Sequence, residues 1–189
     1  VALTNENQAL LQEVTGQGAL QRTSGILAGI VARPPESPYD TLTLAGGSKA
    51  GITVGQEAFG PGNVPLGVVS SVLADFSRVT LFSAPGMATH GCIGQAALPL
   101  TILGAGAGAL QASLSRSAGA VVGDIIFVPG PGMLPIGSVV RIDSDPSMPS
   151  VTLRIQPTLN LFSLAWVELR TTGAKLFPSP LAEETSTLP

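Results

Sequence analysis

The chain has 189 residues and a formal net charge of −3, and its 9 Lys and Arg are dispersed, which argues against a nucleic-acid groove. Hydrophobic residues make up 44% and charged residues only 11%, a composition that excludes a disordered protein. The 23 Gly and 16 Pro, with 4% aromatic residues, favour many short strands and tight turns over a helical bundle.

The first expected element is a helix over residues 1–22, where Glu, Gln, Ala and Leu dominate. Leu3, Asn7, Leu10 and Val14 alternate at spacings of four and three residues, the a/d pattern of a coiled coil. These four residues predict a dimerisation seam, in which the Asn at an a position favours one parallel register. Two heptads are too short alone, so a dimer requires more helix upstream. A short helix packed on its own domain is the alternative.

From residue 25 the pattern changes to short β-rich runs separated by turns that contain Gly and Pro. Eleven strands at this spacing predict an all-β fold of barrels or sandwiches rather than βαβ units. The last fifteen residues, 175–189, combine Pro, Ser, Thr and Glu and predict a flexible tail. The expected strands are 25–32, 40–45, 56–59, 65–73, 78–82, 93–103, 109–114, 125–128, 135–143, 151–156 and 165–171.

A weak internal repeat links residues 51–69 to residues 120–140. Each copy has a Gly-polar entry to a strand, a loop of Gly and Pro, and a second strand of the form Pro-x-Gly-x-Val. Two related β modules are the simplest account of this repetition.

Signals for a membrane span, a disulfide and a metal site are weak. The longest nearly apolar run, 96–110, falls short of the roughly 18 residues of a span and is interpreted as a buried strand and turn. Cys92 is the only cysteine, which excludes an internal disulfide. With His90 as the only histidine, a zinc site requires an unusual ligand set, so neither a metal nor a cofactor is expected. No signal peptide is visible, and we expect further sequence before Val1.

Three patterns imitate enzyme motifs. The segment around His90 is faintly similar to that of a chymotrypsin-type histidine, but neither Gly-Asp-Ser-Gly nor Gly-x-Ser-x-Gly occurs, and a loop histidine is expected. A Cys92 nucleophile has no residue to orient His90. Residues 104–109, with Asp124, match a dinucleotide fingerprint, but no βαβ unit fits and a Gly-rich hairpin is expected. We therefore predict no catalytic residues.

Other polar and aromatic residues receive structural interpretations. Phe162 and Trp166, near the last strand, are expected to anchor the core rather than form a sugar platform. Six carboxylates are expected to be solvated groups at turns and strand edges: Asp40, Glu57, Asp75, Asp124, Asp143 and Asp145.

Several motifs occur in an order that is similar to one known family. They are Leu3-x-x-Glu6-Asn7-x-x-Leu10, the Gly-rich run 44–56, Leu66-Gly67-Val68-Val69, residues 77–81, Gly123-Asp124, Leu134-Pro135-Ile136-Gly137 and the closing segment 156–167. In this order they resemble the bacterial rod-shape-determining protein MreC family over roughly residues 1–172.

The resemblance implies two small six-stranded β-barrels behind a coiled coil. We expect the helix end at 1–22, a first barrel at 23–82 plus 151–174, a second barrel at 83–150, and the tail at 175–189. The family has no catalytic residues to transfer.

The resemblance also implies a non-enzymatic scaffold of the cell-wall elongation machinery. It implies a location on the periplasmic side, with an inner-membrane anchor upstream, and partners that include a second copy, a class B penicillin-binding protein and MreD. A surface poor in Lys and Glu is easily desolvated, and we expect the barrels to offer strand edges and apolar patches to partners. The alternatives are a β-barrel module that binds a ligand and a degenerate chymotrypsin-like hydrolase that uses His90.

Overall fold

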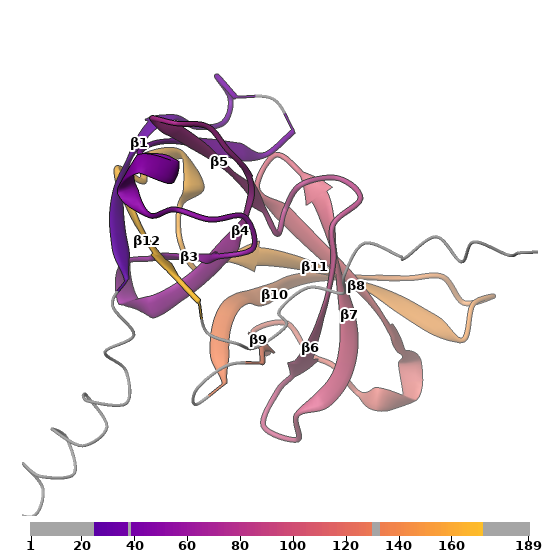
Figure 1. Cartoon of the computed structure of the whole chain (residues 1–189). Helices are drawn as coiled ribbons and strands as arrows, with labels where there is room; N and C mark the ends of the chain where they lie inside the picture. The colour runs from indigo at the N-terminus through magenta and orange to yellow at the C-terminus, as the bar shows by residue number, and fades with distance from the viewer. Residues whose placement is uncertain (1–24, 38, 130–132, 172–189) are drawn as a thin grey trace, which may run out of the picture.

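The computed structural model describes residues 25–37, 39–129 and 133–171. In these residues, twelve strands form two closed six-stranded barrels that lie side by side (Figure 1). The predicted all-β fold with two six-stranded barrels is confirmed. The predicted helix at 1–22, its seam residues Leu3, Asn7, Leu10 and Val14, and the predicted tail at 175–189 lie outside the described residues.

The first barrel has the strand order β1-β12-β3-β4-β5-β2, and every neighbouring pair is antiparallel. Apolar side chains alternate into it, as in β2, where Leu42 and Leu44 are buried and the residues between them face outward. Its strands are β1 (Ile26–Ala32), β2 (Thr41–Ala45), β3 (Glu57–Gly60), β4 (Val64–Val72), β5 (Phe76–Leu81) and β12 (Trp166–Arg170).

The second barrel has the order β10-β11-β8-β7-β6-β9. Its strands are β6 (Ala88–Ile93), β7 (Leu98–Gly106), β8 (Ala109–Ser115), β9 (Ile125–Val128), β10 (Leu134–Ser144) and β11 (Ser150–Pro157). Short 3₁₀ turns lie between consecutive strands, at Ser48–Ala50, Pro61–Asn63, Arg116–Ala118 and Leu161–Ser163. The last of these, between β11 and β12, lies in the connection from the second barrel back to the first.

Two strand assignments from the sequence are wrong. The predicted strand at 93–103 is two strands, β6 and β7, because Gly94 and Ala97 take positive φ angles of 67° and 49° in a turn. Apolar residues inside that turn concealed it. The expected loop at His90 is part of β6, where pairing with β7 and β9 overrides a weak local strand preference.

The predicted barrel boundary at residue 151 is also wrong, because β11 belongs to the second barrel. It forms a long hairpin with β10, in register from Gly137↔Pro157 to Ser144↔Val151. Consecutive antiparallel strands usually pair, so the predicted boundary separated two strands of one hairpin. Of the two last strands, only β12 lies in the first barrel, between β1 and β3.

Comparison of the two strand orders reveals a tandem repeat with exchanged last strands. The neighbours β3-β4-β5-β2-β1 of the first barrel correspond to β9-β10-β11-β8-β7 of the second. The sixth place in the first barrel is filled by β12, and the sixth place in the second by β6. In Figure 1 the yellow β12 accordingly lies beside the indigo and violet strands of the N-terminal half. The chain thus consists of two repeats, β1–β6 and β7–β12. The last strand of each repeat, β6 or β12, lies in the barrel formed by the other repeat.

The predicted internal repeat corresponds to equivalent places in the two barrels. Gly55 N donates to Val69 O at 2.9 Å, and Gly123 N donates to Val139 O at 2.8 Å. Both glycines have positive φ angles, 93° and 99°, which favour Gly over residues with a side chain. These matched bonds begin the β3–β4 hairpin in one barrel and the β9–β10 hairpin in the other.

Each barrel has a buried apolar core, and the two barrels are joined by specific contacts. Phe59 and Phe82 come from the first half of the chain but pack in the core of the second barrel. The buried Asp40, before β2, accepts a hydrogen bond through Oδ2 from Gly108 N, 2.7 Å away in the β7–β8 turn. These contacts hold the outer faces of the two barrels in one arrangement.

Candidate interaction surface

The outer surface of the first barrel carries an apolar face, which we define as Leu27, Val31, Ala45, Phe76 and Trp166. All five are exposed, and the four large side chains expose 68%, 57%, 47% and 58% of their surface for Leu27, Val31, Phe76 and Trp166. Single exposed apolar residues are common on protein surfaces, but several of them in one contiguous patch often mark an interaction site.

The pairing register places these residues together. Trp166 in β12 is opposite Gly29 in β1, Gly29 is opposite Ala45 in β2, and Ala45 is opposite Phe76 in β5. Leu27 lies two residues before Gly29 and shares its face of the strand, because strand side chains alternate. The apolar face is therefore one continuous area across four neighbouring strands.

Charged residues lie at the edges of the apolar face. Lys49 Nζ lies 2.9 Å from Asp75 Oδ1 next to Phe76, and Glu168 pairs with Arg170 on β12. The hydrogen bond from Arg170 lowers the pKa of Glu168 below its usual value. An apolar centre with a charged rim is the usual anatomy of a protein–protein interface.

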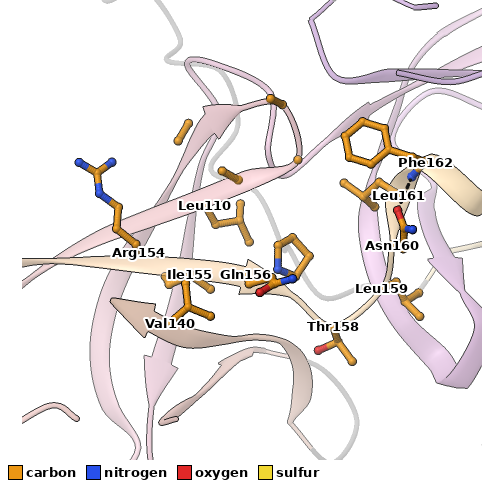
Figure 2. Close-up of a pocket in the computed structure, with 15 residues that line it drawn as sticks. Leu110, Val140, Arg154, Ile155, Gln156, Thr158, Leu159, Asn160, Leu161 and Phe162 are labelled. Atoms are coloured by element: carbon orange, nitrogen blue, oxygen red, sulfur yellow. Dashed lines mark hydrogen bonds between the residues drawn. The ribbon is translucent and has the colours of Figure 1, made fainter. Parts of the chain in front are cut away.

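A second feature is a groove of about 640 Å³ between the β7–β8 hairpin and the segment that connects β11 to β12 (Figure 2). Its floor includes the buried Leu110 and Ile155. Arg154 and Phe162 stand at opposite ends of the view in Figure 2, with Thr158 between them. The groove is thus elongated and has polar as well as apolar walls.

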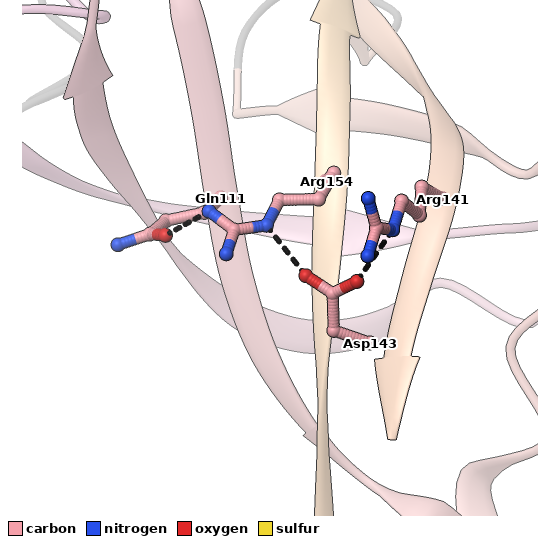
Figure 3. A network of polar contacts seen from close by, with 4 residues as sticks. All are labelled: Gln111, Arg141, Asp143 and Arg154. Atoms are coloured by element: carbon pink, nitrogen blue, oxygen red, sulfur yellow. Dashed lines mark hydrogen bonds and ion pairs between the residues drawn. The ribbon is translucent and has the colours of Figure 1, made fainter. Parts of the chain in front are cut away.

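An ionic network fixes the Arg154 end of this groove (Figure 3). Asp143 lies between two guanidinium groups, 2.8 Å from Arg154 Nε and 2.6 Å from Arg141 Nε. Arg154 also donates from Nη1 to Gln111 Oε1 at 3.0 Å. The Arg154 hydrogen bond, followed by the charge of Arg141, holds the pKa of Asp143 below its usual value. These contacts bring together β8, β10 and β11.

The residues considered for catalysis do not form a catalytic arrangement. The exposed His90 is opposite Thr101 on β7, whereas Cys92, two residues along β6, is buried. Burial raises the pKa of the Cys92 thiol, which disfavours the reactive thiolate at neutral pH. Residues 104–109 form the expected hairpin between β7 and β8 rather than a dinucleotide loop followed by a helix.

The carboxylates divide into two groups. Asp40 and Glu57 are buried, so the expectation of solvated groups is wrong for them. Asp124 accepts a bond from Val121 N at 2.9 Å, and Asp145 accepts from Ser147 N at 2.9 Å, both as caps of turns. Within the described ranges, no cluster of three or more His, Cys, Asp or Glu side chains is arranged to hold a metal ion.

The interpretation of Phe162 and Trp166 as core anchors is wrong, since about half of each side chain is exposed. Val167 and Leu169 are buried, and their period of two turns Trp166 to the outer surface. That alternation was present in the sequence and is the signal that predicts an exposed tryptophan. Because both barrels are closed, the expectation that strand edges face partners is also wrong.

These features define a class: a tandem β-barrel protein with an exposed apolar face and a groove. Where the structure describes the chain, it contains no helix with the length and apolarity required to cross a membrane. Among curated protein sequences, no match to the chain was found.

The barrel-core model of the family described as rod shape-determining protein MreC matches residues 30–170, three quarters of the chain. The chain belongs to the MreC family. Among solved structures, it is similar to MreC from Pseudomonas aeruginosa, with 19% identity, a TM-score of 0.70, and coverage of 78% of this chain and 99% of that one.

Two further structures share the fold. One is the major periplasmic domain of the cell shape-determining filament MreC, with 21% identity, a TM-score of 0.59, and coverage of 77% of this chain and 94% of that one. The other comes from a complex between penicillin-binding protein PBP2 and MreC from Helicobacter pylori, with 14% identity, a TM-score of 0.54, and coverage of 78% and 98%.

Proposed function

We propose that this protein is an extracytoplasmic scaffold of the cell-wall elongation machinery, and that it binds a class B penicillin-binding protein through the apolar face. The family membership supports a role in rod shape, and the complex from Helicobacter pylori gives a precedent for the partner. The periplasmic domain of the similar filament protein supports the location. The scaffold acts by binding, without a chemical step of its own.

The apolar face is the observation that carries the choice of docking site. Phe76 and Trp166 are large, exposed aromatic residues joined by the pairing register through Ala45 and Gly29, and Leu27 lies beside them on β1. Aromatic residues are enriched in protein–protein interfaces. The outer surface of the second barrel also exposes apolar side chains, such as Leu103, Ile125 and Val140. Polar groups lie among them: Gln111 is directly opposite Leu103, Thr101 lies two residues before it, and the Asp143 network lies on β10 and β11. A partner that buries apolar surface gains more on the first barrel.

The test is the affinity of the purified chain for the class B penicillin-binding protein of the same organism. Leu27→Asp and Phe76→Asp each place a charge within the apolar face, and each is expected to cost about 2 kcal/mol, or roughly thirtyfold in Kd. Thr101→Asp places the same charge on the exposed face of the second barrel and is the matched control. Equal affinities for all four proteins would contradict the assignment of the face.

The scaffold we propose also self-associates, contacts MreD and is anchored to the inner membrane by a helix upstream of residue 1. Self-association rests on the predicted seam of Leu3, Asn7, Leu10 and Val14. In a chain that retains the upstream sequence, Asn7→Leu is expected to change the oligomeric state in sedimentation. An unchanged distribution would count against a buried Asn7 in the seam.

A further inference from the structure

Two exposed aromatic residues lie near the end of the first barrel: Phe162 in the segment that connects β11 to β12, and Trp166 at the start of β12. Each ring lies against a glycine: three atoms of the six-membered ring of Trp166 come within 3.3–3.7 Å of the position that a Cβ on Gly29 would occupy. Two atoms of the Phe162 ring are 3.7 Å from the corresponding position on Gly108. The glycine supports one side of each ring, and about half of each side chain remains exposed.

Two adjoining hollows lie along the segment that carries the rings. The groove of about 640 Å³ and a second hollow of about 340 Å³ share Leu159 and Asn160 in their walls. Phe162 lines the first, and Trp166 lines the second together with Pro61. The two aromatic rings therefore line two adjoining hollows along one connecting segment, and we refer to these hollows together as the groove.

Exposed polar side chains alternate along one wall of this groove at Gln156, Thr158 and Asn160 (Figure 2). Asn160 Oδ1 accepts a hydrogen bond from Phe162 N at 3.0 Å, which orients the amide and leaves its exposed Nδ2 group for solvent or a ligand. Small side chains on the opposite wall, including Ala107, leave the groove open. The site thus combines flat apolar platforms with amide and hydroxyl groups.

We propose that this groove binds a linear oligosaccharide. A pyranose ring has an apolar face of C–H groups and a rim of hydroxyl groups, so it suits an exposed aromatic ring with amides and hydroxyls beside it. An apolar peptide would offer Gln156, Thr158 and Asn160 only its backbone N–H and C=O groups, whereas a sugar offers several hydroxyl groups on each ring.

The charge of the chain argues against the other ligand that stacks on aromatic platforms, a single-stranded nucleic acid. Such ligands require a positively charged groove along their phosphates. The chain carries a net charge of −3, and the one arginine in this groove, Arg154, is already paired with Asp143. An uncharged sugar polymer has no such requirement.

The experiment titrates the intact chain with hexamers of N-acetylglucosamine and of glucose, read by isothermal calorimetry and by the fluorescence of Trp166, the only tryptophan. We expect saturable binding of at least one hexamer, with a change in Trp166 emission. Binding of the acetylated hexamer alone assigns the amides a role in recognising acetamido groups, and binding of both assigns the site to glycans in general. Binding of neither at millimolar concentrations would overturn the proposal.

Substitutions of the two aromatic residues test whether oligosaccharide binding depends on their rings. Trp166→Ala and Phe162→Ala are each expected to weaken binding about fivefold, the effect of losing one aromatic stacking contact, while Trp166→Phe retains most of the affinity. Phe76→Ala is the matched control, because Phe76 is equally exposed on the same barrel but lies outside the groove. Full affinity in both alanine variants would overturn the assignment. Trp166 belongs both to the apolar face and to the groove, whereas Leu27 and Phe76 belong only to the apolar face and Phe162 only to the groove. The Phe76 and Phe162 variants therefore let the two proposals fail separately.

Discussion

The exchange of β6 and β12 predicts that the two barrels unfold as one cooperative unit. Leu153, in β11, is fully buried in the core of the second barrel, while Trp166, in β12, lies in the first barrel. Leu153→Ala removes buried methyl groups at a cost of about 2–5 kcal/mol. With a loss of about 3 kcal/mol and a urea slope of about 2 kcal/mol/M, the unfolding midpoint falls by roughly 1.5 M.

The assay is urea unfolding followed in the same samples by Trp166 fluorescence and by far-ultraviolet circular dichroism. Because the only tryptophan reports on the first barrel, a mutation in the second barrel is expected to shift both signals equally. Leu81→Ala, at a fully buried site in the first barrel, is the reciprocal variant, and Leu73→Ala, at a highly exposed site, is the control without a shift. A Trp166 transition that stays in place in Leu153→Ala would refute the coupling.

Three further predictions concern polar groups. Asp40→Ala is expected to destabilise the fold by about 1–3 kcal/mol in urea titrations, because Gly108 N loses a buried hydrogen-bond acceptor. Asp40→Asn keeps an acceptor oxygen and is expected to cost less stability. Equal losses of stability in the two variants would contradict this role of Asp40. The pKa of Asp143 is lowered, chiefly by Arg154, so its contribution is complete at neutral pH, declines as pH falls below 3.8 and is lost below the folded-state pKa. Asp143→Asn is therefore expected to flatten acid unfolding only in that range; a change confined to neutral pH would contradict it. Cys92 is expected to react with iodoacetamide more slowly in the native chain than in denaturant, and equal rates would show an accessible thiolate.

Most strands of the two barrels could be predicted from the sequence, because local residue patterns determine where they begin and end. Alternation of buried and exposed residues, as in β2, and turns with Gly or Pro place most strands within two residues of their observed bounds. The turn at 94–97 is not predicted by these patterns, because its residues are mainly small and apolar. The membership of β11 depends on long-range pairing, which local patterns do not contain.

The candidate interaction surfaces are harder to predict from the sequence than the strands, for two reasons. Trp166 was interpreted from its hydrophobicity, although the buried Val167 and Leu169 beside it place it on the outer side. The apolar face also requires Phe76 to meet Ala45 across a strand pair, and register is a tertiary property. Sequence reasoning therefore predicts which residues point outward more readily than which outward residues lie together.

The most direct test of the scaffold account is photo-crosslinking in living cells of the source organism. A photoreactive amino acid replaces Leu27 or Phe76 in the apolar face, or Thr101 on the second barrel, in the full-length protein. The account predicts a crosslink to a class B penicillin-binding protein from positions 27 and 76 and none from position 101. Crosslinks from position 101 alone, or from none of the three, would contradict docking on the apolar face of the first barrel.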